Sequence, residues 1–327
     1  MMFHPTAPGL AWSKRNRKSC VASVRRRLSP GRRVVVPKCP QRVENEGVFS
    51  LSIIENAMRR ALADGALQPI ETQTILLDSG GVRFVLRTVS SLARKDEARH
   101  VVASPDPLGT YDRSLFVGDV APSHYILLNK FQLLAGHVLL VTRRFERQER
   151  LLTLEDFAAL ITCLNEVDGL AFYNGGVEAG ASQRHKHLQL VPLPLARESA
   201  DEVPMERVLG SDSRLPFRHA FSRLEPHATA PELHALYREL LHRCGISAVA
   251  AEEGEVQSAP YNLLVRRGWM LVVPRSRACF ESIAVNGLGF AGSLFLRSQE
   301  ELDRVHAMGP MHVLRTVAMP QDVPHDA

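Results

Sequence analysis

The chain has 327 residues, of which 45% are hydrophobic and 23% charged, with a formal net charge of +5. This length suits one large domain or two of ordinary size, and the composition is that of a folded protein. No stretch approaches the roughly 18 consecutive apolar residues that a membrane-spanning helix needs, so we expect no membrane partner.

The positive charge is concentrated at the N-terminus. Residues 1–42 contain eleven Lys or Arg and no Asp or Glu, so the rest of the chain holds 29 basic against 35 acidic residues, a net charge of −6. Because the remainder is acidic, we expect no nucleic-acid partner for it. An Arg-rich, Ser-containing, acid-free head is typical of a transit peptide, and residues 1–45 are predicted to be a disordered targeting segment for an organelle, here the chloroplast. The alternative is a cytoplasmic protein with a basic arm that contacts RNA or an acidic partner.

The cysteines indicate neither a disulfide framework nor a zinc site. They form no C-x-x-C pair, and only three of them lie beyond the basic head. A reducing compartment fits this usage. The five are Cys20, Cys39, Cys163, Cys244 and Cys279.

In the first half of the chain, apolar spacing predicts a helix over residues 50–64 and a strand over 82–87. Residues 96–123 are rich in turn formers and are predicted to be irregular. HYILLNK and HVLLVTR, separated by a short link, predict an antiparallel hairpin. Thr153, with Asp156 three residues on, predicts the start of a further helix.

In the second half, GLAFY predicts a strand, and the polar residues 197–217 a connector. Pro231 opens a predicted helix that Gly245 stops. YNLLVRRGWMLVVP predicts a hairpin that turns near Gly268, and a helix is predicted over residues 299–307.

Strands joined by hairpins favour an α+β fold in which helices pack on an antiparallel sheet. We expect residues 46–200 to form the catalytic region. Residues 201–327 would complete the sheet and the nucleotide site.

The stretch YNGGVEAGASQRHKHLQLVP, residues 173–192, carries the most chemical information. In a strand, alternate side chains share a face, so His185, His187 and Gln189 point one way while Lys186 and Leu188 point the other. Three such polar side chains on one face indicate a site or a face open to water.

The loop before these histidines is built for close approach. Gly175, Gly176 and Gly180 have no Cβ, and successive backbone N–H groups in such loops form anion sites. Ser182 and Gln183 add side-chain donors. A polyphosphate is the expected ligand, and an imidazole that points at it suggests nucleophilic attack on phosphorus.

Simpler interpretations remain open from these residues alone. An H-x-H pair on a strand can be half of a metal site, although Gln189 is a poor zinc ligand. The histidines can also be surface residues without a role, and the glycines can merely shape a tight connection.

This stretch resembles the signature of the diadenosine tetraphosphate phosphorylases, or ATP adenylyltransferases, the branch of the histidine-triad superfamily in which Gln replaces the third His. The segments ALQPIET, ILLNKF, GHVLLVTRRF, YNLLVRRGWMLVVPRS and VNGLGFAGSLFLRSQEEL also resemble family segments, in family order. The resemblance covers roughly residues 50–315 and implies a histidine-triad-like sheet with a C-terminal extension.

Carried over by position, the resemblance implies that His187 is the nucleophile, that His185 orients it and that Gln189 binds phosphate. It implies no metal ligand. The other implied substrate-contacting residues are Lys95, Asn129, Lys130, Asn174, Gly180, Ala181, Ser182, Gln183, Asn286, Gly287, Leu288, Ser293 and Arg297.

Two positions depart from the pattern expected of fungal members, which have a larger apolar residue at Ser293 and Lys at Arg297. Arg keeps the charge but turns a point donor into a fork, so nucleotide preference is left open. Residues 287–292 also match G-x-G-x-x-G, but the strand-like SLFLRS follows where a dinucleotide site needs a helix.

The implied reaction is reversible phosphorolysis of diadenosine tetraphosphate to ADP and ATP through an adenylyl-histidine. The expected partners are thus the dinucleotide, ATP, ADP and phosphate. Alternatives are a hydrolase of the same fold, a uridylyltransferase acting on sugar phosphates, and a nucleotide sensor with little catalysis. The sequence requires no cofactor, and leaves open a divalent cation such as Mg²⁺ and the oligomeric state.

Overall fold

The computed structural model describes residues 49–89, 105–210 and 215–321. Its helices are α1 (Leu51–Ala63), α3 (Leu154–Glu166), α4 (Ala230–Arg243), α5 (Gln299–Met308) and α6 (Pro310–Val317), with short 3₁₀ turns η1 (Arg113–Leu115), η2 (Val177–Ala179), η3 (Pro204–Arg207) and η4 (Gly287–Ala291). Its strands are β1 (Gln68–Pro69), β2 (Thr72–Ser79), β3 (Val82–Val89), β4 (Phe116–Ala121), β5 (His124–Leu128), β6 (Phe131–Gln132), β7 (Val138–Thr142), β8 (Gly169–Gly175), β9 (His187–Pro192), β10 (Ala220–Arg223), β11 (Ala248–Ala251), β12 (Gly254–Gln257), β13 (Tyr261–Arg266), β14 (Trp269–Pro274), β15 (Cys279–Phe280), β16 (Ile283–Ala284) and β17 (Ser293–Leu296).

The predicted helix boundaries are confirmed by local capping. The Thr153 hydroxyl accepts from the Asp156 N–H, and the Asp156 carboxylate accepts from the Thr153 N–H, which closes a capping box at the start of α3. Gly245 follows α4 at φ +73°, a conformation that glycine adopts without strain. The helix predicted over 299–307 is α5, but the sequence did not predict α6, which Pro310 opens directly after Gly309.

A large antiparallel sheet carries the predicted hairpins. Its strand order is β10-β14-β13-β8-β9-β7-β5-β4, and each neighbouring pair is antiparallel. Strand β9 therefore lies near the centre of the sheet, between β8 and β7. The fold class is α+β, as predicted.

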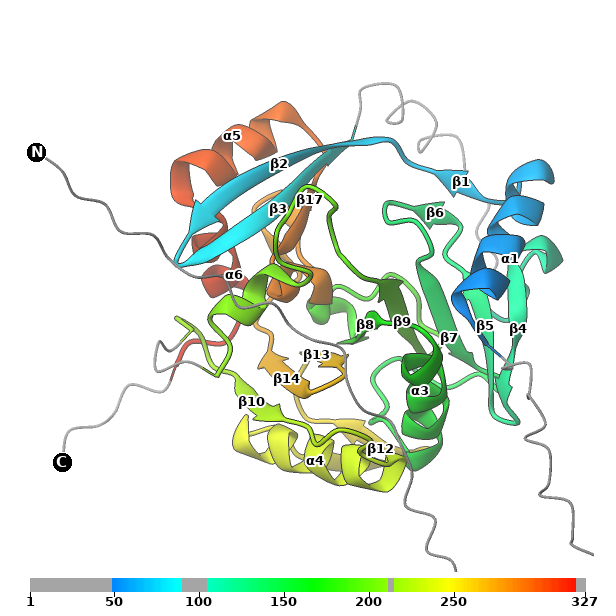
Figure 1. Cartoon of the computed structure of the whole chain (residues 1–327). Coiled ribbons are helices and arrows are strands. Elements are labelled where there is room, and N and C mark those ends of the chain that lie inside the picture. Colours follow the sequence, from blue (N-terminus) through cyan, green and yellow to red (C-terminus); the bar gives the residue numbers. More distant parts are fainter. Residues whose placement is uncertain (1–48, 90–104, 211–214, 322–327) are drawn as a thin grey trace, which may run out of the picture. The chain divides into compact units, whose positions relative to one another are not determined.

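The two faces of this sheet are covered by different elements. On one face, α1, α3 and α4 enclose a core that includes Leu188 and Leu190 of β9. The other face packs partly against the three-stranded sheet β17-β3-β2, which carries α5 and α6 on its side (Figure 1). Because Leu188 and Leu190 point toward the helices, His187 and Gln189 point to the opposite face, as the alternation predicted.

The prediction that residues 96–123 are irregular is wrong in its last part. Residues 116–121 form β4, the edge strand that pairs with β5 through two register shifts. Such shifts interrupt the alternation of buried and exposed side chains, which removes the signal that marks a strand. Residues 96–104 lie outside the described part of the chain.

The G-x-G-x-x-G match does not form a dinucleotide site. The segment forms the 3₁₀ turn η4, and β17 begins directly after Gly292 where such a site requires a helix. Within residues 49–89, 105–210 and 215–321, the structure contains no helix long and apolar enough to span a membrane.

Candidate active site

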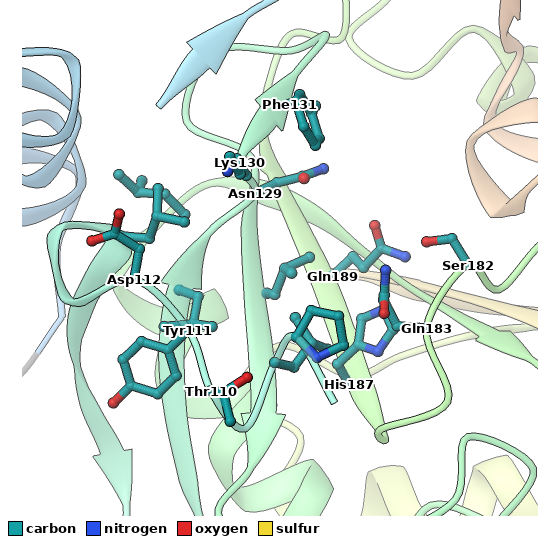
Figure 2. Close-up of a pocket in the computed structure, with 16 residues that line it drawn as sticks. Thr110, Tyr111, Asp112, Asn129, Lys130, Phe131, Ser182, Gln183, His187 and Gln189 are labelled. Atoms are coloured by element: carbon teal, nitrogen blue, oxygen red, sulfur yellow. The ribbon is translucent and has the colours of Figure 1, made fainter. Parts of the chain in front are cut away.

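A cavity of about 560 Å³ opens over β5, β7 and β9 on the face that carries the histidine. Figure 2 shows His187, Gln183 and Gln189 gathered at one end and Thr110, Tyr111 and Asp112 along the opposite wall. The lining residues are Pro107, Leu108, Thr110, Tyr111, Asp112, Leu115, Leu127, Leu128, Asn129, Lys130, Phe131, Leu139, Ser182, Gln183, His187 and Gln189.

The hydrogen bonds of His187 fix which of its ring nitrogens can react. Its Nδ1 lies 2.8 Å from the backbone oxygen of His185. A carbonyl oxygen only accepts, so Nδ1 carries the proton and Nε2 keeps its lone pair. Burial lowers the pKa of His187 to about 4, so the ring is neutral at physiological pH. A neutral imidazole with a free Nε2 lone pair is a nucleophile.

Gln189 is held by a chain of hydrogen bonds that starts at Asn129. The Asn129 amide nitrogen lies 3.1 Å from Nδ1 of His137, and Nε2 of His137 lies 2.9 Å from the amide oxygen of Gln189. If Asn129 donates to Nδ1, then Nε2 donates to Gln189. The Gln189 amide oxygen is then occupied, which leaves the two N–H groups of its NH₂ to donate into the cavity.

The His185 side chain lies behind the cavity wall rather than in it. Its Nδ1 is 3.0 Å from the carboxylate of Asp106, and its Nε2 is 2.8 Å from the backbone oxygen of Thr142. Both ring nitrogens thus face oxygen atoms that can accept, and these contacts hold the ring in place. His185 lies just before β9 and forms an isolated bridge with Arg147. It contacts His187 through its backbone oxygen, not through its ring.

The loop that contains Gly176 and Gly180 packs closely against the backbone of Val285 and Asn286. Gly176 and Gly180 have φ of +92° and +88°. A Cβ on Gly180 would lie 2.7 Å from the backbone oxygen of Val285 and 2.9 Å from the Cα of Asn286. Glycine at position 180 is therefore required both by its backbone conformation and by the neighbouring segment.

A second cavity, of about 410 Å³, lies next to the first and shares Asn129, Phe131 and Ser182 with it. Its lining combines apolar side chains with the polar residues Asn129, Ser182, Asn286, Ser293 and Arg297. The lining residues are Ile70, Val89, Asn129, Phe131, Leu133, Gly180, Ser182, Ala278, Ala284, Val285, Asn286, Gly289, Ser293, Leu294, Phe295 and Arg297. Two adjoining cavities with a shared polar border fit a ligand that has two ends.

The structure brings most of the predicted site residues to these two cavities. Those on the first are Asn129, Lys130, Ser182, Gln183, His187 and Gln189. Those on the second are Asn129, Gly180, Ser182, Asn286, Ser293 and Arg297. Lys95 lies outside the described residues.

Four predicted residues lie behind the walls instead of on them. The Asn174 amide oxygen accepts from the Gly287 N–H at 2.9 Å, so both residues connect the two loops. Leu288 belongs to the apolar core, and the Ala181 N–H donates to the backbone oxygen of Gly176 at 3.1 Å. These contacts shape the walls rather than provide groups that a ligand in either cavity could reach.

Arg275 connects the same two loops and was missed from the sequence. Its guanidinium donates to the backbone oxygens of Ala179 and Val285, the residues before Gly180 and Asn286, at 3.2 and 2.9 Å. Burial lowers the pKa of Arg275 to about 9. His137 and Asp106 were also missed, because nothing in the local sequence marks a residue whose partner is 50 to 80 positions away.

No group of three or more His, Cys, Asp or Glu side chains that could hold a metal ion occurs among the described residues. The donors at both cavities are amides, hydroxyls and cationic side chains. These suit an anionic ligand better than a bare cation.

Two family models match adjoining parts of the chain. The Ap4A phosphorylase N-terminal domain matches residues 41–211, and the ATP adenylyltransferase C-terminal domain matches residues 213–320. The large sheet contains strands from both regions, since β10, β13 and β14 come from the second.

Two curated relatives come from Saccharomyces cerevisiae. The chain is 26% identical to Protein APA1 over 291 residues, which are 78% of this chain and 88% of the relative. It is 29% identical to diadenosine 5',5'''-P1,P4-tetraphosphate phosphorylase 2 over 255 residues, 66% of this chain and 76% of the relative.

The fold is shared with crystal structures of the yeast Ap4A phosphorylase Apa2. The structure of that protein superposes with a TM-score of 0.68 at 22% identity, covering 84% of this chain and 100% of Apa2. The structure of Apa2 in complex with Ap4A gives the same TM-score at 24% identity. With the two family models spanning residues 41–211 and 213–320, this chain belongs to the Ap4A phosphorylase and ATP adenylyltransferase family of nucleotidyltransferases.

Proposed function

We propose that the protein phosphorolyses diadenosine tetraphosphate, yielding ADP and ATP, through a covalent adenylyl-histidine on His187. The observation that carries this proposal is the neutral His187 ring, whose Nδ1–H donates to the backbone of His185 and whose Nε2 lone pair is left for attack in a cavity that holds Gln183 and Gln189. The matching family models and the name of one yeast relative support the same substrate.

In the first step, Nε2 of His187 attacks the α-phosphorus of the dinucleotide. The bond from that phosphorus to the bridging oxygen breaks, ATP leaves, and AMP remains bound to the ring. Amide donors of Gln183 and Gln189 and the hydroxyl of Ser182 are suited to stabilise the charge that develops on the phosphoryl oxygens.

In the second step, an oxygen of inorganic phosphate attacks the same phosphorus. The phosphorus–nitrogen bond breaks, ADP forms, and the electron pair returns to Nε2. The Nδ1–H of His187 keeps donating to the backbone oxygen of His185 in both steps, because that oxygen is a fixed acceptor. The reverse sequence makes the dinucleotide from ATP and ADP.

The shared border of the two cavities is where the polyphosphate would lie, since Ser182 and Asn129 line both. The AMP moiety that is transferred would occupy the cavity with His187, and the leaving nucleotide would occupy the second. We include a divalent cation such as Mg²⁺ in this proposal as a companion of the nucleotide. Its role is tested by the rate at fixed substrate as EDTA and then Mg²⁺ are added.

A product assay with trapping of the intermediate tests the reaction. The expected products are ADP and ATP with phosphate consumed. A sample denatured after reaction with labelled dinucleotide in the absence of phosphate should hold labelled AMP on His187. His187→Ala should lose both turnover and label. AMP and ATP without use of phosphate would instead identify a hydrolase, and turnover of sugar nucleotides a uridylyltransferase. Tight binding without label would identify a sensor.

The Arg-rich head supports one further part of the proposal, a location in the chloroplast after removal of residues 1 to about 45. Mass spectrometry of the protein from its native cells tests this. A mature chain that retains those residues would contradict it.

A further inference from the structure

The Gln148 side chain lies in a gap between β8 and β9 at the level of His187. It is 1% exposed. Its amide oxygen accepts from the backbone N–H of His187 at 2.9 Å, and its amide nitrogen donates to the backbone oxygens of His187 and Asn174 at 3.2 and 3.0 Å. One side chain therefore binds both backbone groups of the reactive residue.

This side chain takes the place of the next rung of the sheet. The β8–β9 ladder ends at the pair Phe172 and Gln189. Continued in the same antiparallel register, Asn174 would stand opposite His187. There the two backbones bind the Gln148 amide instead of each other, so the strands separate at the level of the cavity. On its other edge, His187 stays paired with Val141 of β7.

Gln148 is itself held on both sides of its backbone. Its N–H donates to the backbone oxygen of Arg184 at 2.8 Å, and its own oxygen accepts from the buried Tyr173 hydroxyl. Neighbouring Arg147 bridges to His185. The amide is thus presented from a fixed backbone, and its position does not depend on a free rotamer.

We propose that Gln148 is the positioning residue for the nucleophile, in that its amide fixes the backbone of His187 and so the place of Nε2. The hydrogen bond from Nδ1 to His185 fixes only the rotation of the ring, whereas the position of the ring as a whole follows its backbone. Only a primary amide supplies the acceptor and the donors that this gap requires. The inference rests on the proposed role of His187.

The test compares Gln148→Met with a matched control, Tyr237→Phe. Tyr237 is also fully buried and also bonds a backbone N–H, that of Leu152, but it lies on α4, on the other face of the sheet. Gln148→Met removes three buried hydrogen bonds and Tyr237→Phe removes two, those to the Leu152 N–H and the Tyr261 hydroxyl, so both are expected to lower the midpoint of unfolding. Only Gln148→Met should also act on the chemistry.

The decisive measurement is the single-turnover rate at which labelled diadenosine tetraphosphate adenylates each folded variant, alongside the affinity for AMP. We expect Gln148→Met to lower that rate by about ten- to a hundredfold, the cost typical of a displacement near 1 Å, while AMP affinity stays that of the wild type. Gln148→Glu should be equally slow, since its carboxylate would face two backbone oxygens. Tyr237→Phe should keep the wild-type rate.

Two results would overturn the inference: a wild-type adenylation rate in Gln148→Met, or a loss of AMP affinity as large as the loss of rate. Failure of the proposed function looks different, because then the wild type itself carries no label. In that case, the rate of amide hydrogen exchange at His187 tests whether Gln148 fixes the backbone of His187. Exchange faster in Gln148→Met than in Tyr237→Phe supports it, and equal exchange refutes it.

Discussion

The Nδ1 atom of His187 donates to the backbone oxygen of His185 across 2.8 Å, and the His185 ring in turn bonds Asp106. The two histidines of the H-x-H motif therefore have different roles. One is neutral and faces the cavity, and the other anchors the start of β9 to the segment that carries Asp106. The contact between them uses the backbone oxygen of His185, so the His185 ring can bond Asp106 at the same time.

The pH profile of the adenylation step should follow the His187 ring. Burial lowers its pKa to about 4, so the neutral, reactive form persists as pH falls from 7 to about 5 and is lost as pH falls through about 4. Single-turnover rates after rapid pH jumps measure this. A rate that already halves near pH 6.5, the ordinary value for histidine, would contradict the assignment.

Stability should also decline in acid because of His187 and His137. Burial lowers the pKa of each ring to about 4, whereas the unfolded chain binds these protons near 6.5. The unfolded state therefore gains protons first, and the free energy of unfolding decreases as pH falls from about 6.5 towards 4. The slope approaches about 1.4 kcal/mol per pH unit for each ring. Urea unfolding at several pH values measures this slope. In His137→Asn, the slope should be smaller by the contribution of one ring.

Gly180→Ala should impair the second cavity far more than the same change at Gly268. Both glycines have positive φ, so alanine is strained at either place, by about 1–2 kcal/mol. At Gly268 a Cβ meets nothing within 4 Å, whereas at Gly180 it would displace Val285 and Asn286. We expect a raised KM for the dinucleotide in Gly180→Ala only. Equal KM values in the two variants would show that the close approach of the loops is unimportant.

Lys186→Met should destabilise the fold but leave the active-site cavity unchanged, because Lys186 does not line it. Lys186 is fully buried between the two histidines but points the other way, with Nζ 2.5 Å from Asp156 and 3.2 Å from Glu146. Removing one partner of such a buried pair typically costs about 3–5 kcal/mol. The control is Arg238→Met, which breaks a half-exposed pair with Glu255 and should cost about 1 kcal/mol or less. Chemical denaturation of both variants checks the contrast.

Ser293→Val tests the effect of having serine at position 293, where a larger apolar residue is expected in fungal members of the family. The Ser293 hydroxyl accepts from the guanidinium of Arg87 at 2.7 Å, and Arg87, 5% exposed, has no carboxylate within ion-pair distance among the described residues. Valine would leave a buried donor without its acceptor, at a cost of about 1–3 kcal/mol, and would alter the second cavity. Unfolding midpoints and KM should therefore both change, whereas Ser247→Ala, at an exposed serine far along the chain, should change neither.

The sequence alone determined the features that depend on neighbours along the chain. Alternation placed His187 and Gln189 on one face and Lys186 on the other, and the glycines marked a loop built for close approach. Thr153 with Asp156 fixed the start of α3. The edge strand β4 was not predicted, because its register shifts interrupt the alternation that identifies a strand. Helix α6 was missed because Pro310 follows Gly309 directly, and a Gly-Pro pair usually marks a turn or the end of a helix.

Tertiary structure alone decided which residues complete the site. Asp106 reaches His185 across 79 positions, Gln148 reaches His187 across 39, and Arg275, directly after β14, reaches Ala179 across 96. Each of these contacts depends on which strands become neighbours and in what register. That is settled only when the sheet forms and its two faces are buried, because the sequence near each residue carries no mark of its distant partner.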